Sequence, residues 1–171
     1  MNWERAKKFV EGMGILSRGG FDPRGPYAQA CLETGWFEHS YGSGLNFWGL
    51  KKFKGWNGAI FTVQSNEEIK GKMIPITSVF CNPANIGEAM RMYSKFVANR
   101  FKPSWDARAD AKNYLTLLSS GKYGAWATDS HYLESLLKIL DFVSVRGEHI
   151  ELLEPRMLEY LEVINAKTGK L

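Results

Sequence analysis

The chain has 171 residues, of which 44% are hydrophobic, 13% aromatic and 23% charged. This length fits one compact domain with a buried core, and the composition excludes an intrinsically disordered chain. The net charge of +4 has the sign expected of a protein that meets an anionic polymer, either bacterial cell wall or nucleic acid, and does not choose between them.

Cysteine usage and the N-terminus bear on the class of protein. Cys31 and Cys81 form no CxxC pair, and both are predicted to be buried free thiols. No segment approaches the roughly 18 apolar residues of a membrane-spanning helix, and residues 1–8 lack the apolar stretch of a signal peptide. We therefore expect no integral membrane segment and no export signal in this sequence.

Two helices are predicted in the first 35 residues. Helical spacing of apolar residues over 3–10 predicts a helix that ends near Gly12 and Gly14, with a loop over 17–21. The second helix is predicted to follow Asp22 as its N-cap, with Pro23 at the first helical position, and to stop at Gly35.

A loop and a hairpin are expected next. Residues 42–58 are rich in glycine and aromatic residues, which predicts an irregular loop. Residues 59–64 and 73–80 are β-prone, and the polar segment 65–72 between them is predicted to be the hairpin connection. Pro75 restricts its strand to an edge or a bulge.

The sequence after the hairpin predicts helices. Asn85 and Glu88 form a capping box, Asp106 is expected to cap a helix, and Thr128 or Asp129 another. The pattern is α+β, mostly helical, with a small β lobe inserted after the second helix and a cleft between the lobes. Apolar stripes define these helices over 86–97, 111–118, 132–143 and 157–164.

Glu33 is the first candidate for chemistry. It lies in the last turn of the predicted second helix, where the negative end of the helix dipole and partial burial both disfavour the carboxylate form. A carboxyl group that stays protonated is what a glycosidic leaving oxygen requires. The alternative is a solvated glutamate at a frayed helix end, and position alone favours that alternative.

The surrounding strings favour the catalytic interpretation. AQACLETGW (28–36) and NFWGLK (46–51) resemble the AQxxLESGWG and NLFGIK pair of the bacterial glucosaminidase family, the autolysins and flagellar or phage hydrolases that cut peptidoglycan. EAMRMYSKFV (88–97) and KYGAWATDSHYLESLLKIL (122–140) resemble two further family segments in the same order. The resemblance covers residues 27–143.

The resemblance implies a fold, a reaction and a domain plan. It implies a lysozyme-like fold and hydrolysis of the β-1,4 bond between N-acetylglucosamine and N-acetylmuramic acid, with Glu33 as general acid. Residues 1–145 are then the catalytic domain, and 146–171 a C-terminal helical tail that either packs on the domain or serves as a contact element.

The resemblance also implies a second carboxylate in the hairpin lobe. The family's T…E…G setting corresponds here to Thr62–Gly71, which leaves Glu67 and Glu68, and we prefer Glu67, four residues before Gly71. An ionised carboxylate there would activate water or stabilise positive charge on the sugar. The alternative is that both glutamates are exposed residues of a hairpin tip.

Several residues are expected to bind the sugar. Tyr132 matches the family tyrosine that faces the sugar near the acid; its alternative is packing in the core. Flat aromatic rings pack against the C–H face of a pyranose, which makes aromatic residues near the motifs candidates for the cleft. The predicted substrate-binding set is Trp36, Asn46, Trp48, Tyr123, Trp126, Asp129 and Tyr132.

The sequence departs from the family pattern at three positions. Phe37 replaces a usual glycine, Trp48 a usual phenylalanine and Ser130 a usual proline. These departures bear on the shape of the sugar subsites more than on the chemistry.

No cofactor or metal is expected. His39, His131 and His149 are scattered, and the sequence has no HExxH motif, P-loop or GxGxxG cradle. The short lysine cluster at 51–54 lacks an RNP or helix-turn-helix context, so we expect an anionic glycan strand as the partner and not nucleic acid.

Two rival functions stay open. One is a lytic transglycosylase or muramidase on the same architecture, which also places one glutamate at a helix end. The other is a non-catalytic cell-wall-binding or tail module that keeps the cleft. We expect action on the bacterial cell wall, and a phage or prophage endolysin is the first choice for a wall hydrolase without a signal peptide. Oligomeric state and stereochemical course are left open.

Overall fold

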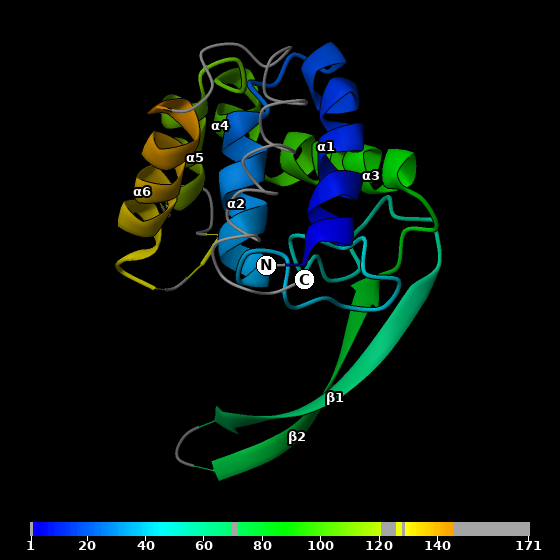
Figure 1. The fold of residues 1–171 in the computed structure, drawn as a ribbon. Helices are drawn as coiled ribbons and strands as arrows, with labels where there is room; N and C mark the ends of the chain where they lie inside the picture. Colours follow the sequence, from blue (N-terminus) through cyan, green and yellow to red (C-terminus); the bar gives the residue numbers. More distant parts are fainter. Residues whose placement is uncertain (1, 70–71, 121–125, 128, 146–171) are drawn as a thin grey trace, which may run out of the picture.

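The computed structural model describes residues 2–69, 72–120, 126–127 and 129–145. Figure 1 shows helices gathered into one body and a long β-hairpin that leaves it. The described elements are α1 (Trp3–Arg18), α2 (Arg24–Thr34), β1 (Ile60–Ile69), β2 (Lys72–Cys81), α3 (Ile86–Arg100), α4 (Lys102–Asp106), α5 (Ala111–Ser119) and α6 (Tyr132–Val145).

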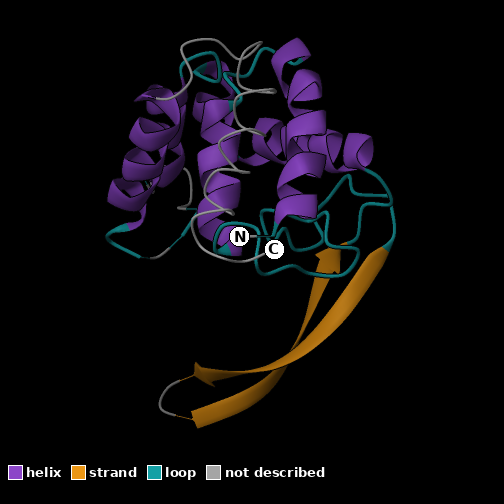
Figure 2. Ribbon diagram, in the orientation of Figure 1, coloured by secondary structure: helices purple, strands orange, loops and turns teal. Residues whose placement is uncertain are grey.

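The arrangement confirms the predicted α+β class. Helix α2 packs against α5 and α6, and α1 packs against α3. The hairpin follows α2 and precedes α3, as expected, and Figure 2 shows it outside the helical body. The predicted last helix and the proposed tail, residues 146–171, lie outside the described residues. None of the described helices is long and apolar enough to cross a membrane.

Helix α1 is longer than predicted. It runs through Gly12 and Gly14 to Arg18, so the predicted end near the glycines is wrong. Gly12 is buried where α1 approaches α3, and a Cβ atom there would lie 2.5 Å from the Met90 side chain. The glycine therefore permits close helix packing, which outweighs its low helix propensity.

Helix α2 ends as the sequence predicts. Gly35 adopts the left-handed conformation with φ of 56° and stops the helix, which leaves Glu33 in its last turn. At the other end, the Asp22 carboxylate accepts a hydrogen bond from the Arg24 amide at 3.1 Å, and the helix begins at Arg24, one residue later than expected. Pro23 is therefore the N-cap.

The turn after Glu33 is sharp. Trp36 and Phe37 follow Gly35 in the left-handed region, with φ of 59° and 66°. The Phe37 amide donates to the Thr34 hydroxyl at 2.8 Å, and the Phe37 ring is fully buried. The conformation costs about 1–2 kcal/mol for a residue with a Cβ atom. Burial of the ring offsets this cost.

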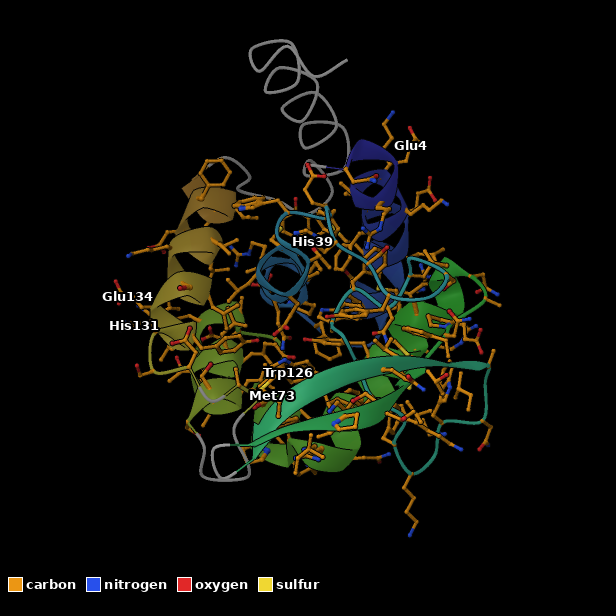
Figure 3. All side chains as sticks on the ribbon, turned by 90° about the horizontal axis from the view of Figure 1, so that it is seen from below. Glu4, His39, Met73, Trp126, His131 and Glu134 are labelled. Carbon is orange, nitrogen blue, oxygen red and sulfur yellow. The ribbon has the colours of Figure 1, made fainter. Side chains whose placement is uncertain are left out.

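The hairpin is longer than predicted. Its strands extend over residues 60–69 and 72–81, and Glu67 pairs with Ile74. The prediction that 65–72 forms the connection is therefore wrong. Pro75 pairs with Asn66 in a two-stranded sheet, where every strand is an edge, as expected. Figure 3, a view from below, shows the hairpin in front of the helical body, with Trp126 labelled beside it in this view.

The helix caps follow the sequence in part. The Asn85 side chain accepts from the Glu88 amide at 2.9 Å, but the Glu88 carboxylate accepts from Ala84 and not from Asn85. Asp106 ends α4 and does not cap α5; Asp110 takes that role by accepting from the Asn113 amide at 3.0 Å.

The core lies among the helices. Phe9, Phe37 and Phe47 contact one another through their rings and are fully buried. Cys31 and Cys81 are buried and unpaired, which confirms their prediction as free thiols. The irregular loop predicted over 42–58 is also confirmed, and it packs over this core.

Candidate active site

Glu33 is held by two donors that come from distant parts of the sequence. Its Oε1 atom accepts a hydrogen bond from the Trp126 indole nitrogen at 2.9 Å and from the Tyr132 hydroxyl at 2.7 Å. Trp126 precedes α6 and Tyr132 begins it, whereas Glu33 ends α2. The packing of α2 against α6 therefore assembles the site.

Burial raises the pKa of the Glu33 carboxyl above its usual range, because the charged form loses hydration. The hydrogen bonds from Tyr132 and Trp126 act in the opposite direction, since they stabilise the carboxylate. Burial is the larger effect. The direction agrees with the expectation from the sequence.

The two carboxyl oxygens of Glu33 differ in their surroundings. The indole nitrogen of Trp126 can only donate, so Oε1 must act as an acceptor toward it in either protonation state. Oε2 has no partner among the described residues, where no buried side-chain nitrogen or oxygen lacks a hydrogen bond. When the Glu33 carboxyl is protonated, the proton therefore belongs on Oε2, because Oε1 accepts from both donors.

Glu33 lines a pocket of about 340 Å³. Its apolar walls come from the loop before β1, from α3 and from Trp126, and its polar side is cationic. The described lining consists of Glu33, Trp48, Gly49, Leu50, Lys51, Lys52, Phe53, Phe96, Arg100, Phe101 and Trp126. Glu33 is the only acidic residue in this lining.

Three predicted sugar-binding residues lie at this site. Trp126 and Tyr132 contact Glu33 directly, and Trp48 lines the pocket. Trp48 is nevertheless almost fully buried: its indole nitrogen donates to the Pro26 carbonyl at 3.1 Å, and its ring stacks on Tyr93 with centroids 3.9 Å apart. It forms the floor of the pocket.

The structure corrects the prediction that Asn46 binds the sugar. It is fully buried, and its amide nitrogen donates to the carbonyls of Leu50 and Cys81 while its oxygen accepts from the Leu50 amide. The side chain has no donor left for a sugar. Its role is to fasten the loop to the end of β2.

Trp36 and Asp129 also fall outside the pocket lining. The Trp36 ring packs edge-on against Phe142, with centroids 5.9 Å apart, on the outer side of α6. Asp129 is exposed, and its carboxylate accepts from the His131 amide at 2.9 Å just before α6. Neither residue lines this pocket, and their predicted contact with the sugar stays a prediction.

The other predicted residues are described only in part. Tyr123 lies outside the described residues. Glu67 and Glu68 are placed by their backbone within β1. Within the described residues, no group of three or more His, Cys, Asp or Glu side chains is positioned to hold a metal ion.

The sequence prediction missed a buried polar chain behind Glu33. Gln29 donates to the Tyr132 hydroxyl at 3.2 Å and accepts from the Tyr93 hydroxyl at 2.5 Å, and the Tyr93 hydroxyl also contacts that of Tyr114. One signal was available: Gln29 is a polar residue in an apolar stretch, one helical turn before Glu33. The partners of Gln29 come from α3 and α6, and Tyr114 of α5 joins through Tyr93.

Known proteins share this sequence pattern and fold. The pattern of the glucosaminidase family, described as mannosyl-glycoprotein endo-β-N-acetylglucosaminidase, matches residues 15–143. The chain is 26% identical over 140 residues to the peptidoglycan hydrolase FlgJ of Vibrio parahaemolyticus and 28% identical over 141 residues to that of Pseudomonas aeruginosa. Each match covers 78% of this chain, but 42% and 33% of these relatives, so the chain spans less than half of either.

The fold has a solved counterpart. The C-terminally truncated glycoside hydrolase domain of Salmonella typhimurium FlgJ superposes with a TM-score of 0.66 at 20% identity, over 84% of this chain and 98% of that domain. This likeness confirms the predicted lysozyme-like fold. The family pattern spans both the helix that carries Glu33 and the helix that carries Tyr132. This chain is therefore a member of the glucosaminidase family of glycoside hydrolases.

Proposed function

We propose that this chain hydrolyses the β-1,4 bond between N-acetylglucosamine and N-acetylmuramic acid in peptidoglycan, with Glu33 as the general acid. The observation that carries the proposal is the environment of Glu33. Its carboxyl is largely buried at the edge of a pocket, both of its described donors bind Oε1, and Oε2 has no hydrogen-bond partner among the described residues. Burial raises the pKa of this group, so the acid keeps a transferable proton at a higher pH than an ordinary glutamate.

In the first step, Oε2–H protonates the glycosidic oxygen while the bond from that oxygen to the anomeric carbon breaks. The proton moves to the leaving sugar, and Glu33 becomes a carboxylate. Trp126 and Tyr132 already donate to Oε1, so the new charge meets hydrogen bonds that require no rearrangement. The same two residues therefore assist the acid most when it has given up its proton.

Glu67 is proposed as the second carboxylate, which activates water or stabilises the positive charge on the sugar. Exposure alternates along β1: Phe61 and Val63 are partly buried, whereas Thr62 and Gln64 are exposed. Residues two apart along a strand share a face, so Glu67 has the register of the more buried pair. This register supports Glu67 over the glutamate that follows it.

Cations beside the pocket support an anionic glycan as substrate. Lys51, Lys52 and Arg100 line the pocket, and Lys54 joins Arg100 in the lining of the adjoining pocket. Peptidoglycan carries lactyl-linked peptide stems with carboxylate groups, whereas unsubstituted chitin-like chains carry none. Both sequence relatives are named peptidoglycan hydrolases, which supports the same substrate and action at the bacterial cell wall.

Product analysis tests the proposed bond. Purified peptidoglycan is digested, and the fragments are separated and identified by mass spectrometry. The proposal expects reducing N-acetylglucosamine ends. Reducing muramic acid ends would identify a muramidase, anhydromuramic ends would identify a lytic transglycosylase, and either would overturn the bond assignment.

The Glu33→Gln variant tests the proposed acid. Glutamine keeps the size and an acceptor oxygen but has no acidic proton, so turnover is expected to fall by about 10²-fold or more. Tyr27→Phe, a buried substitution on the same helix away from the pocket, is the matched control. A wild-type protein that binds peptidoglycan without cutting it, with equal binding by Glu33→Gln, would favour the non-catalytic binding module.

A further inference from the structure

We propose that Gln29, with Tyr93 and Tyr114 behind it, is a positioning residue that holds the Tyr132 hydroxyl proton on Oε1 of Glu33 and so keeps the acid proton on Oε2. The inference deepens the proposed function and rests on it. None of the three residues lines the pocket. Their hydrogen bonds reach the acid through Tyr132.

The direction of this hydrogen-bond chain follows from its distances. The contact from Tyr93 to Gln29 measures 2.5 Å, and the contact from Gln29 to Tyr132 measures 3.2 Å. Bonds between hydroxyl and carbonyl oxygens are shorter than those donated by nitrogen. The amide oxygen of Gln29 therefore faces Tyr93, and its nitrogen faces Tyr132.

Proton counting fixes the remaining links. The single hydroxyl proton of Tyr93 goes to Gln29, so the contact between Tyr93 and Tyr114 takes its proton from Tyr114. The Tyr132 hydroxyl accepts from Gln29 and donates its own proton to Glu33. Every donor from Tyr114 to Tyr132 therefore points toward Glu33.

Burial makes this order hard to change. Gln29, Tyr93 and Tyr114 are fully buried, and Tyr132 is 7% exposed. Water does not supply alternative partners there, so reversing one link leaves a buried polar atom without its bond. Tyr132 consequently cannot turn to accept a proton from Oε1, which would misplace the acid proton on the side away from the pocket.

The other groups around Glu33 have separate effects. The titratable or charged neighbours among the described residues are Tyr132 of α6 and Tyr93 of α3, together with Lys51, Lys52 and Arg100 in the pocket lining. The three cations are exposed, so salt screens their influence. Salt does not screen the effect of a buried hydrogen-bond chain on the Glu33 pKa.

The test measures the Glu33 pKa directly. Protein labelled with ¹³C at glutamate carboxyl carbons is titrated by NMR, and the Glu33 signal is identified by its loss in Glu33→Gln. In Gln29→Met the carboxylate loses support from the chain, so the Glu33 pKa is expected to rise above the wild-type value. Tyr93→Phe, which frees the Gln29 amide to flip, raises it as well, and Tyr114→Phe raises it least.

Controls separate this effect from general disturbance of the core. Tyr27→Phe removes a buried hydroxyl from the same helix. This hydroxyl bonds to the Cys31 thiol and takes no part in the hydrogen-bond chain through Gln29, so the Glu33 pKa is expected to stay unchanged. The difference in Glu33 pKa between wild type and Gln29→Met should be the same at about 0.02 M and about 0.5 M salt. A difference that arose from exposed charges would shrink at the higher salt concentration, because salt screens them. Tyr93→Phe and Tyr114→Phe nearly conserve volume, so they keep the test available if Gln29→Met does not fold.

Hydrolysis supplies the second readout. In Gln29→Met, kcat is expected to fall about 10-fold, a fraction of what a general acid contributes, with KM little changed because Gln29 does not touch substrate. A Glu33 pKa in Gln29→Met and Tyr93→Phe equal to that of wild type would overturn the inference, as would an equal shift in Tyr27→Phe. The NMR titration requires no turnover, so it remains decisive if product analysis overturns the proposed function.

Discussion

The helical body and the hairpin, which supply the two proposed carboxylates, are built in different ways. Glu33 is held by two hydrogen bonds and backed by a fully buried polar chain. The two strands of the hairpin pair with each other, and Met73 and Ile74 on β2 are 65% and 40% exposed. A two-stranded hairpin has little independent stability. The acid is therefore preorganised by the core, whereas the place of its partner depends on an exposed ribbon.

The largest effect on this comparison is expected in the hairpin. Glu67→Gln should lower kcat by about 10²-fold, because it removes the proposed second carboxylate. Glu68→Gln, one residue further along β1, is the matched control and should change kcat less than about twofold. Peptidoglycan turnover checks both. The opposite ranking would assign the second carboxylate to Glu68.

Phe37 tests how the helical body fixes the end of α2. Phe37→Ala and Phe37→Gly both lose the buried ring and should each lower the free energy of unfolding by about 3–5 kcal/mol. Glycine tolerates the positive φ of 66° at this position, so Phe37→Gly should be the more stable of the two by about 1 kcal/mol. Urea denaturation measures the difference. Equal stability, or a more stable alanine variant, would show that the turn is not strained.

Trp126 tests the balance of effects on the acid. Trp126→Phe removes one donor to Oε1, so the Glu33 pKa should rise further and kcat should fall by about 10-fold as the new carboxylate loses a hydrogen bond. The pH at which kcat/KM declines on the alkaline side should move upward. A downward move would mean that the indole stabilises the protonated acid instead.

The smallest effect is expected from the cations. Lys51→Gln with Lys52→Gln should raise KM about threefold at low salt, and the difference should vanish near 0.5 M salt, where the Debye length is only a few ångströms. Lys8→Gln, an exposed lysine of α1 outside the pocket lining, is the control. A salt-independent rise in KM would assign the lysines a direct hydrogen-bonding role.

The helix end that carries Glu33 could be predicted from the sequence because it is encoded locally. Glu33 is followed after one residue by Gly35, whose left-handed φ ends the helix, and these features lie in one short motif. Trp126 and Tyr132 could also be predicted, because they lie in the recognisable segment 122–140. The hydrogen-bond chain through Gln29 could not be predicted, since the partners of Gln29 lie 64 and 103 residues away and become its neighbours only when the helices pack.

The errors have local physical causes. Asn46 occurs in a recognisable motif, but its amide serves the backbone of Leu50 and Cys81, and sequence alone does not distinguish that role from sugar binding. The polar residues 65–68 suit a strand as well as a turn, so the strands of the hairpin were predicted too short. Gly12 was taken as a helix end, although contact with α3 explains it.

The central claim is that burial keeps Glu33 protonated and makes it the general acid. The most direct measurement is kcat/KM for peptidoglycan hydrolysis against pH, which reports groups of the free enzyme. An essential acid is active below its pKa, and burial raises the pKa of Glu33, so activity should persist above about 4.3, the value of an ordinary glutamate, and fall as pH rises through the raised pKa. A decline centred at the ordinary value would contradict the account.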